Sequence, residues 1–333
     1  MLLEVKNLNI HFKSDRSDTP IHAVRDLSFS LKQGEMLGVV GESGSGKSIT
    51  NLALMGLLPD SAIVTAETAK FNGSDLLNLK ERQWQNIRRR EVAMIFQDPM
   101  TALNPFLSIQ YQLMETIQTH LKLSKKDALD RCVELLSLVG IPSPKDRLKS
   151  YPFELSGGMA QRIMIAMAIS TNPKLLIADE PTTALDVTIQ KQILDLIKML
   201  QEKNNMSVIL VTHDLGVVSQ YSENLQVMYA GEVVESGTTY DLITHPRHPY
   251  THALLGSRPG ALVENIRRAP KTQLPSISGI VPAFHQRPIG CQFNPRCEFV
   301  TNECKQAPIP LFTEEPRHRE YRCIHPIAAE AIR

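Results

Sequence analysis

Residues 41–48 have the sequence Gly-Glu-Ser-Gly-Ser-Gly-Lys-Ser, which matches the phosphate-binding loop pattern G-x-x-x-x-G-K-[S/T]. An apolar run, residues 36–40, precedes the loop, and a helical pattern follows it. A glycine-rich loop between a buried strand and a helix directs backbone N–H groups and the helix N-terminus toward an anion. A plain Gly/Ser turn would not require all four fixed positions. The sequence therefore predicts a nucleotide site in an α/β fold.

The residues of the loop have different expected roles. We expect Lys47 to reach the β- and γ-phosphates and Ser48 to hold Mg²⁺ through its hydroxyl. Phe12 ends the first predicted strand, where its ring either stacks on an adenine or packs in the core. The backbone of the other loop residues is expected to surround the phosphates: Gly41, Glu42, Ser43, Gly44, Ser45 and Gly46.

The composition is that of a globular protein. With 333 residues, 42% of them apolar, the chain is long enough for one large or two ordinary domains. Lys and Arg number 36 against 35 Asp and Glu, so nothing in the charge balance indicates a nucleic-acid partner. The N-terminus lacks the pattern of a secretory signal, and no apolar run approaches the roughly 18 residues of a membrane helix. We therefore expect a cytoplasmic chain that reaches a membrane only through a partner.

Alternating strand and helix patterns predict a mostly parallel sheet covered by helices on both faces. Two partly alternating segments, 2–12 and 27–31, predict an additional antiparallel β-layer. After about residue 258, prolines recur and interrupt any regular pattern, which predicts an irregular extension with little core of its own. The other predicted elements are strands at 36–40, 70–72, 92–96, 174–179 and 207–212, short strands near 227 and 233, helices at 47–57, 79–89 and 188–203, and a helical insertion at 109–139.

Residues 175–180, Leu-Leu-Ile-Ala-Asp-Glu, form a predicted strand that ends in two carboxylates. Asp179 is placed to hold Mg²⁺ through water, and Glu180 to orient and deprotonate an attacking water. Strands that end in acidic residues are common, so the segment alone is weak evidence. In a chain that also carries the phosphate loop, it strongly indicates nucleotide hydrolysis.

Gln97 and His213 each follow a predicted strand, at the edge where open parallel sheets bind ligands. We expect Gln97 to contact Mg²⁺ and the attacking water. His213 is expected to hydrogen-bond the γ-phosphate and the same water. A lone histidine is more often a satisfied polar group, and its position directly after a strand favours the functional interpretation.

Residues 155–162, Leu-Ser-Gly-Gly-Met-Ala-Gln-Arg, precede a predicted helix. The Ser156 hydroxyl and the amides exposed by Gly157 and Gly158 form a second element that can bind an anion. In isolation the segment would be interpreted as an ordinary helix N-cap. Because one phosphate loop already serves this chain, the second element suggests a nucleotide held by another subunit.

The order of these motifs resembles the ATP-binding subunits of ABC transporters, from residue 2 to about residue 258. The matching motifs are Walker A at 41–48, the Q-loop at Gln97, the signature at 155–159, Walker B at 175–180, the D-loop Ala184-Leu185-Asp186 and the switch His213. Met159 departs from the glutamine that the family normally has at the end of its signature. The signature serine and both glycines remain.

The resemblance implies a RecA-like core with an antiparallel β-subdomain and a helical subdomain at about 98–170. It also implies a head-to-tail dimer in which each ATP lies between the phosphate loop of one subunit and the signature of the other. ATP binding closes the dimer and hydrolysis reopens it, with Asp186 crossing the interface. A groove after Gln97 would receive a coupling helix of the membrane subunits. Its candidate residues, for which core packing is the alternative, are Met100, Leu103, Phe106 and Leu107.

Residues 245–255, His-Pro-Arg-His-Pro-Tyr-Thr-His-Ala-Leu-Leu, resemble the element that follows the nucleotide domain in importers of dipeptides, oligopeptides and nickel. Proline separates several of the histidines, which favours a recognition or docking segment over a metal site. Within that family the chain is most similar to the D-type ATP-binding subunits of dipeptide permeases. The implied partners are a sister F-type ATP-binding subunit, two transmembrane permease subunits and, indirectly, a periplasmic peptide-binding protein. The implied location is the cytoplasmic face of the bacterial inner membrane.

Four of the five cysteines lie within the proline-rich extension, residues 259–333: Cys291, Cys297, Cys304 and Cys323. Four thiolates in a reducing compartment suggest a metal site rather than disulfides. The spacing lacks the close C-x₂-C pairs of most zinc ribbons. ATPases of the resembling family carry a [4Fe-4S] cluster here, which we favour over zinc and over unligated thiols.

The resulting hypothesis is an ATP-hydrolysing subunit, of the translocase class, of a bacterial ABC importer of dipeptides. The same importer could also carry oligopeptides or haem. The alternative is the ATPase subunit of an importer of another substrate, such as nickel. A soluble ABC ATPase acting on ribosomes or DNA would be expected to have tandem phosphate loops or long coiled-coil insertions. A P-loop small-molecule kinase has no use for the segment at 155–159.

Overall fold

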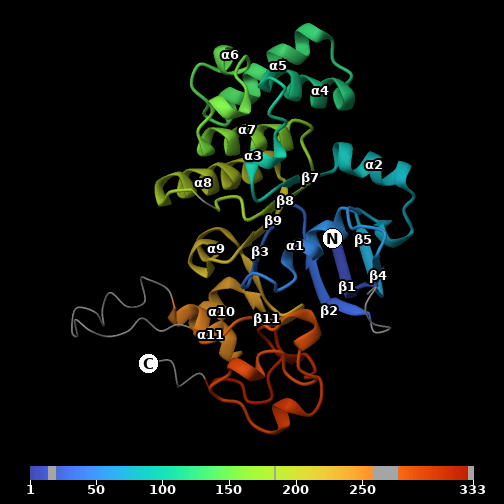
Figure 1. Ribbon diagram of the computed structural model, residues 1–333, viewed down its shortest axis with the longest axis vertical. Helices are drawn as coiled ribbons and strands as arrows, with labels where there is room; N and C mark the ends of the chain where they lie inside the picture. The colour runs from blue at the N-terminus through green and yellow to red at the C-terminus, as the bar shows by residue number, and fades with distance from the viewer. Residues whose placement is uncertain (14–19, 184, 258–276, 329–333) are drawn as a thin grey trace, which may run out of the picture. The chain divides into compact units, whose positions relative to one another are not determined.

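The computed structural model describes residues 1–13, 20–183, 185–257 and 277–328 (Figure 1). The chain forms two compact units. Unit 1 contains residues 1–31, 36–78 and 212–333, and unit 2 contains residues 32–35 and 79–211. The predicted boundary at 258/259 lies outside the described residues, so the division into a domain of residues 1–258 and an extension stays a prediction. No helix in the described parts of the chain combines the length and apolar character needed to cross a membrane.

Unit 1 contains the expected antiparallel layer, shown in blue in Figure 1. Strand β1 pairs with three neighbours, and the strand order is β2-β1-β5-β6 with β4 also on β1. In β1, Leu3, Val5, Leu8 and Ile10 are buried while Lys6 and Asn7 are exposed. This near-alternation is what a sheet with one covered face requires. The strands are β1 (Leu3–Phe12), β2 (Ile21–Leu31), β4 (Ala62–Thr65), β5 (Thr68–Phe71) and β6 (Ser74–Asp75).

A second group of strands in unit 1 carries the phosphate loop. Strand β3 runs parallel to β10, and β10, β11, β13 and β12 follow in antiparallel order. The strands are β3 (Met36–Val40), β10 (Asn224–Tyr229), β11 (Glu232–Thr238), β12 (Phe312–Glu314) and β13 (Arg319–Tyr321). The helices of unit 1 are α1 (Lys47–Leu54), α9 (Leu215–Tyr221), α10 (Thr239–Thr244) and α11 (Pro249–Gly256).

The extension is more regular than expected, because its two strands add to the sheet through β11. Backbone pairing of Glu235 with Tyr321 and of Ser236 with Glu320 orders β13. The extension, predicted to be irregular, therefore includes two short strands. Its prolines lie outside the two strands, so they do not remove any hydrogen bond of the ladder.

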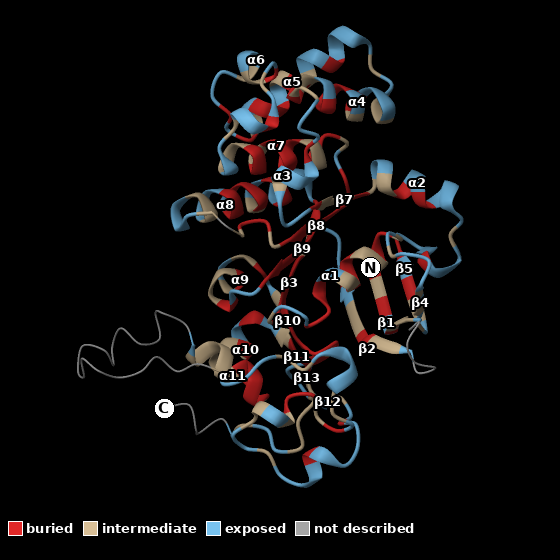
Figure 2. Ribbon diagram, in the orientation of Figure 1, coloured by how far each residue is buried: buried red, intermediate tan, exposed pale blue. Residues whose placement is uncertain are grey.

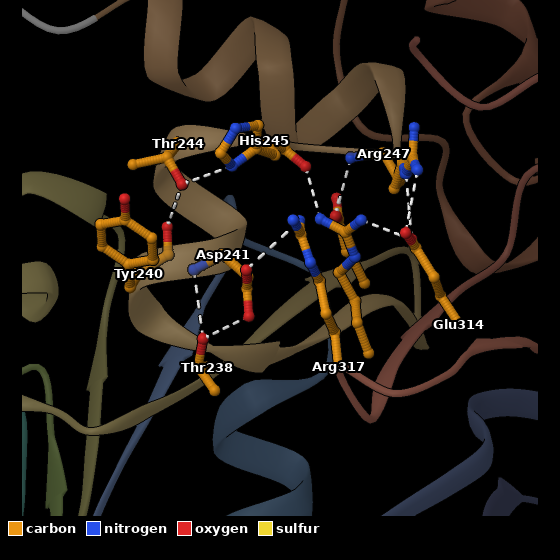
Figure 3. Close-up of polar contacts among 10 residues, drawn as sticks. Thr238, Tyr240, Asp241, Thr244, His245, Arg247, Glu314 and Arg317 are labelled. Atoms are coloured by element: carbon orange, nitrogen blue, oxygen red, sulfur yellow. Dashed lines mark hydrogen bonds and ion pairs between the residues drawn. The ribbon is translucent and has the colours of Figure 1, made fainter. Parts of the chain in front are cut away.

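An ion-pair network attaches the extension to the segment between α10 and α11 (Figure 3). The Arg247 guanidinium donates to both carboxylate oxygens of Glu314, at 2.9 and 3.0 Å, and to the carbonyl of Ile327 at 3.0 Å. Nearby, Arg317 pairs with Asp241 at 3.5 Å. The segment at 245–255 thus serves as a docking segment within its own chain.

Unit 2 is built on three parallel strands, in the order β9-β8-β7. The five residues of β8 and the six of β9 are all buried, as the red ribbons of Figure 2 show. Apolar residues on both faces of a strand are typical of a parallel sheet covered by helices. The strands are β7 (Val92–Ile95), β8 (Leu175–Asp179) and β9 (Ser207–Thr212), and the predicted parallel sheet is confirmed here.

The expected helical insertion is present, divided into several helices. The break between α4 and α5 follows from Lys122, whose φ of 55° is left-handed, and from Ser124, whose side chain caps α5 by accepting the N–H of Asp127. The helices of unit 2 are α2 (Glu81–Arg90), α3 (Pro99–Ala102), α4 (Ile109–Leu121), α5 (Lys125–Leu138), α6 (Pro144–Arg147), α7 (Gly157–Ile169) and α8 (Val187–Asn204). Short 3₁₀ helices in the two units are η1 (Leu76–Asn78), η2 (Pro152–Glu154), η3 (Phe284–Gln286), η4 (Asn294–Arg296) and η5 (Glu303–Lys305).

Candidate nucleotide site

The phosphate loop joins β3 to α1 in unit 1, as the sequence predicts. Gly44 and Gly46 have φ values of 82° and 101°, a left-handed region that favours glycine. The Lys47 side chain is buried and donates to the carbonyls of Gly41 and Glu42, at 2.6 and 3.0 Å. Its ammonium therefore lies over the curled backbone of its own loop. Ser48 is exposed at the first turn of α1, where its hydroxyl can be reached by a ligand.

The first glycine of the loop is required by its contact with β10. A Cβ atom at Gly41 would lie 2.2 Å from the carbonyl oxygen of Met228. The turn after β10 also contacts the loop, since the Gly231 N–H donates to the carbonyl of Ser45 at 2.8 Å. The loop is therefore fixed against the strand that neighbours β3.

Two residues that sequence reasoning missed contact Glu42 of the loop. The Glu42 N–H donates to the hydroxyl of Tyr250 at 3.0 Å, and its carboxylate accepts from Arg296 at 3.0 and 3.1 Å. Tyr250 belongs to the docking segment, whose unusual sequence was the only available signal. No pattern in the sequence marks Arg296.

Two other predicted residues of unit 1 are at the ends of strands. Phe12 is half-buried at the end of β1, opposite Ile21 and Ala62 on the neighbouring strands. His213 is exposed directly after β9, and the next residue, Asp214, caps α9. Their positions are compatible with the expected roles on the adenine and the γ-phosphate, which stay predictions.

Three predicted residues of unit 2 lie at the carboxyl ends of β7 and β8. Asp179 is buried at the end of β8, and Glu180 follows it. The Glu180 carboxylate accepts from Gln97 Nε2 at 3.3 Å and from Thr183 Oγ1 at 2.9 Å. The structure thus brings Gln97 and Glu180 together. Thr183, which was not predicted, helps to orient the carboxylate.

The predicted signature begins helix α7 in unit 2. The Ser156 hydroxyl caps α7 by accepting the N–H of Met159 at 3.4 Å, and both Ser156 and Gly157 are exposed. Gly158 is closely packed, because a Cβ there would lie 3.0 Å from a methyl group of Ile189. The segment is both a helix cap and an exposed set of amides, so the two interpretations of the sequence are compatible.

Asp186 is exposed and caps helix α8, where its carboxylate accepts the N–H groups of Thr188 and Ile189 at 3.1 and 3.0 Å. This capping role was not predicted. Ala184 of the same loop lies outside the described residues.

The groove candidates after Gln97 differ in exposure. Phe106 is 87% exposed and Met100 is 41% exposed, whereas Leu103 is 2% exposed. Leu107 is half-buried. Core packing, the alternative given for these four residues, therefore holds for Leu103, and Met100 and Phe106 remain candidates for a contact with a partner.

The four cysteines of the extension line one pocket in unit 1. It has an empty volume of about 360 Å³ and is also lined by His248, Phe293 and His325, among others. In the described part of the chain, no group of three or more His, Cys, Asp or Glu side chains is arranged to hold a metal ion. The four cysteines named from the sequence thus share one pocket, and their role as metal ligands stays a prediction.

Burial raises the pKa of the Cys291 thiol to about 12, and the neighbouring cysteines 323, 297 and 304 raise it further. The pKa of Cys323 is raised to about 11 for the same reasons. Negative charges so close together repel one another in a poorly hydrated pocket. Near neutral pH the raised pKa values of Cys291 and Cys323 favour the protonated thiols, and a bound cation would favour their thiolate forms.

Two histidines of the docking segment make contacts within the fold. His248 is buried, and its Nδ1 caps α11 by accepting the N–H of Tyr250 at 3.1 Å. Burial lowers the pKa of His248 to about 3. His245 Nδ1 lies 2.7 Å from the hydroxyl of Thr244.

Two family models match the chain. Residues 24–183 match the family described as ABC transporter, and residues 234–304 match the family described as oligopeptide/dipeptide transporter, C-terminal region. The second match includes the docking segment and three of the four cysteines.

Individual relatives match almost the whole chain. The chain is 52% identical to the dipeptide transport ATP-binding protein DppD of Haemophilus influenzae, over 92% of this chain and 90% of the relative. It is 48% identical to the protein of the same name from Escherichia coli, over 98% of this chain and 97% of the relative. The oligopeptide transport ATP-binding protein OppD of Bacillus subtilis is 47% identical, over 95% of this chain and 87% of that relative.

Solved structures with the same fold include an ATP-binding cassette, MJ0796, in a dimeric post-hydrolysis state bound to ADP and Pi. It is 27% identical, with a TM-score of 0.61, and covers 71% of this chain and 98% of its own. A second is CbiO1 of Clostridium perfringens, part of an ABC transporter complex. It is 25% identical, with a TM-score of 0.62, and covers 81% of this chain and 96% of its own.

Proposed function

Because the chain belongs to the ATP-binding proteins of ABC transporters, we propose that it energises a bacterial importer of dipeptides by hydrolysing ATP. The relatives at about half identity are named dipeptide or oligopeptide transport ATP-binding proteins. One observation carries the hydrolytic assignment: Gln97 and Thr183 hold the Glu180 carboxylate directly after the strand that ends in Asp179.

Each motif has a proposed role in binding or hydrolysis. The loop amides and Lys47 bind the ATP phosphates, Ser48 and Asp179 hold Mg²⁺, and Phe12 stacks on the adenine. Glu180 accepts the proton of the attacking water, because its carboxylate is oriented by neighbours on two loops. Gln97 and His213 position the water and the γ-phosphate. Mg²⁺, when bound, neutralises the charge that develops on the phosphates.

The exposed signature supports a second part of the proposal. Ser156 and Gly157 present their polar groups to solvent at the start of α7, where a helix N-terminus favours an anion. We assign them to an ATP bound by a sister subunit, in a heterodimer whose interface Asp186 also approaches. The likeness to the dimeric cassette MJ0796 supports this arrangement.

The proposed partners are two transmembrane permease subunits and a sister ATP-binding subunit, with a periplasmic peptide-binding protein as an indirect partner. Exposed Met100 and Phe106 supply apolar surface for a coupling helix. The protein would then work at the cytoplasmic face of the inner membrane. Dipeptides are favoured over longer peptides, haem or nickel because the most similar of the cited relatives are named dipeptide transport proteins.

Purification of the tagged chain from its native membranes tests this function. We expect it to be isolated with a second ATP-binding subunit and two membrane proteins, and a deletion strain should no longer grow on single dipeptides as its amino-acid source. Isolation with ribosomes or nucleic acid alone would contradict the proposal. Normal dipeptide growth with lost nickel uptake would assign the alternative substrate.

For the four-cysteine pocket we propose a [4Fe-4S] cluster with a structural or redox-sensing role. The donor set of four thiols, of which Cys304 is buried and the other three are half-buried, suits an iron–sulfur cluster or zinc. A cluster is larger than a single ion, so its thiol ligands lie farther apart than those of a zinc site. When bound, the metal would supply the positive charge that allows the thiols to ionise.

Absorbance and metal analysis of anaerobically purified protein distinguish the two metals. A broad band near about 400 nm with stoichiometric iron is expected for the cluster. A colourless protein with one zinc per chain would replace the cluster assignment by a zinc site. A metal-free protein with four reactive thiols would overturn both assignments.

A further inference from the structure

One arginine of the extension contacts the phosphate loop. Arg296 Nη1 lies 3.0 and 3.1 Å from the two carboxylate oxygens of Glu42, the second residue of the loop. The arginine side chain is only 5% exposed, so water competes little for this ion pair. The guanidinium also donates to the hydroxyl of Tyr229 and to the carbonyls of Ile277 and Ser278. It is therefore held in one orientation.

A buried aromatic cluster fixes the backbone of the same loop residue. The hydroxyl of Tyr250 accepts the Glu42 N–H at 3.0 Å. The Tyr250 ring packs against Tyr229 and Phe293, with ring centroids 4.7 and 5.3 Å apart. Glu42 is thus held at its backbone and at its carboxylate by residues from outside the loop.

The backbone of Arg296 lies between two of the pocket cysteines. Helix η4, Asn294–Arg296, starts where the Asn294 N–H donates to the carbonyl of Cys291 at 3.0 Å, and Cys297 directly follows it. The Cys291 N–H in turn donates to the carbonyl of Cys304 at 2.8 Å. A ligand shared by these thiols would fix both ends of the turn that carries Arg296.

We propose that Arg296 is a positioning residue for the phosphate loop, through which metal loading of the four-cysteine pocket increases the affinity for ATP. The inference rests on the proposed nucleotide and metal sites. The loop binds phosphates with its backbone amides, so a loop already held in its curled form loses less conformational freedom on binding. Arg296 and Tyr250 supply that restraint, and the cysteines determine whether the arginine is held in place.

The first test compares variants of the full chain by binding of trinitrophenyl-ATP and, in the assembled transporter, by the KM and kcat of ATP hydrolysis. Arg296→Met is expected to raise Kd and KM by about tenfold, the effect of losing a charged hydrogen bond, with kcat within twofold of wild type. Arg296→Lys keeps one charged hydrogen bond and should recover most of the affinity. Arg317→Met, which removes another ion-paired arginine of the extension, should leave Kd within twofold.

A double-mutant cycle with Glu42→Gln checks that the effect passes through the loop. The double variant should bind no more weakly than Arg296→Met alone, because the two residues share one interaction. Unchanged Kd in Arg296→Met would overturn the proposal. An equal loss in Arg317→Met would also overturn it, by showing that general loosening of the extension is sufficient.

Cys297→Ser tests the link to the metal site, with iron and zinc content measured on the same samples. Loss of metal should be accompanied by about the same tenfold rise in Kd, with no further rise in Cys297→Ser/Arg296→Met. Metal loss with normal Kd would overturn the link. Lys47→Ala separates these outcomes from failure of the proposed function: if trinitrophenyl-ATP binding does not depend on Lys47, the nucleotide assignment itself is wrong.

Discussion

Glu180 has a left-handed backbone conformation, with a φ of 47°, directly after β8. Such a conformation costs a non-glycine residue about 1–2 kcal/mol. It is maintained because the Glu180 N–H donates to the carbonyl of Val211 at 2.9 Å while the carboxylate contacts Gln97 and Thr183. Backbone strain that is held by several neighbours is common where a side chain must be aimed at a substrate.

Glu180→Gln is expected to keep ATP binding and to lower hydrolysis by roughly 100-fold or more, because the amide preserves shape but cannot accept a proton. Binding of trinitrophenyl-ATP and release of phosphate measure the two properties separately. Thr183→Val is the matched control, since it removes only one hydrogen bond to Glu180 and should reduce hydrolysis far less. Undiminished turnover in Glu180→Gln would refute its role as the base.

Gly41→Ala is expected to destabilise the folded chain by about 1–3 kcal/mol and to weaken ATP binding, because the new methyl group would overlap the Met228 carbonyl. Urea unfolding and nucleotide titration measure these effects. The control is Gly256→Ala at the end of α11, where an added Cβ meets nothing within 4 Å. Equal behaviour of the two variants would show that the contact with β10 does not determine the loop conformation.

At the level of elements, the extension is an integral part of unit 1. Strand β13 pairs with β11, and the Arg247–Glu314 ion pair joins the docking segment to β12. Glu235 of β11 is buried, and its carboxylate accepts the N–H groups of Arg247 and His248, at 2.8 and 2.9 Å. Burial raises the pKa of this glutamate. The docking segment is therefore held at its backbone as well as at its side chains.

Arg247→Met is expected to cost about 2 kcal/mol of unfolding free energy, because it leaves the partly buried Glu314 with fewer charged partners. Limited proteolysis of the full chain should then release the extension first. Lys191→Met, which breaks the exposed pair with Asp195, should cost less than about 0.5 kcal/mol. Identical protease patterns for the two variants would contradict the anchoring role.

The same ion pair should weaken in acid. Hydrogen bonding to Arg247 lowers the pKa of Glu314 from 4.5 to about 2, so its stabilising effect is complete above pH 4.5 and disappears as the pH falls toward 2. Glu314→Gln should therefore be less stable than wild type at pH 7, with a difference that shrinks below pH 4.5. Urea unfolding of both proteins between pH 7 and pH 2 measures this difference in stability. Below about pH 6.5 the unfolded chain takes up a proton at His248, whereas burial keeps this histidine neutral in the folded chain down to about pH 3. This loss of stability is common to both proteins and cancels in the comparison. A difference independent of pH would contradict the assignment.

At the scale of the whole molecule, we assign two phosphate-binding segments to the chain, the phosphate loop and the signature. Each is assigned to a different nucleotide. The phosphate loop is held by residues of unit 1, and the signature is an exposed helix start of unit 2. Ser156→Arg should thus leave binding of trinitrophenyl-ATP to the isolated chain unchanged. It should abolish most ATP hydrolysis by the assembled transporter, because we assign the signature to the ATP of a sister subunit. Loss of binding in the isolated chain would contradict an action in trans.

The sequence alone determined the family, the α/β fold and most candidate residues, because those features depend on short contiguous patterns. The phosphate loop needs glycines at fixed positions, and buried parallel strands need unbroken apolar runs such as 175–178. Even the contact of Gln97 with Glu180 agrees with the expectation that strand ends meet at one edge of a sheet.

Only the tertiary structure decided which distant residues support those patterns. Arg296 and Tyr250 contact Glu42 from more than 200 positions away, and no local propensity encodes such a contact. Leu103 is buried because of its neighbours in space, and the extension gains strands because an edge of β11 is available for pairing. Burial and long-range ion pairs depend on the packed fold, whereas the phosphate loop depends on its own backbone.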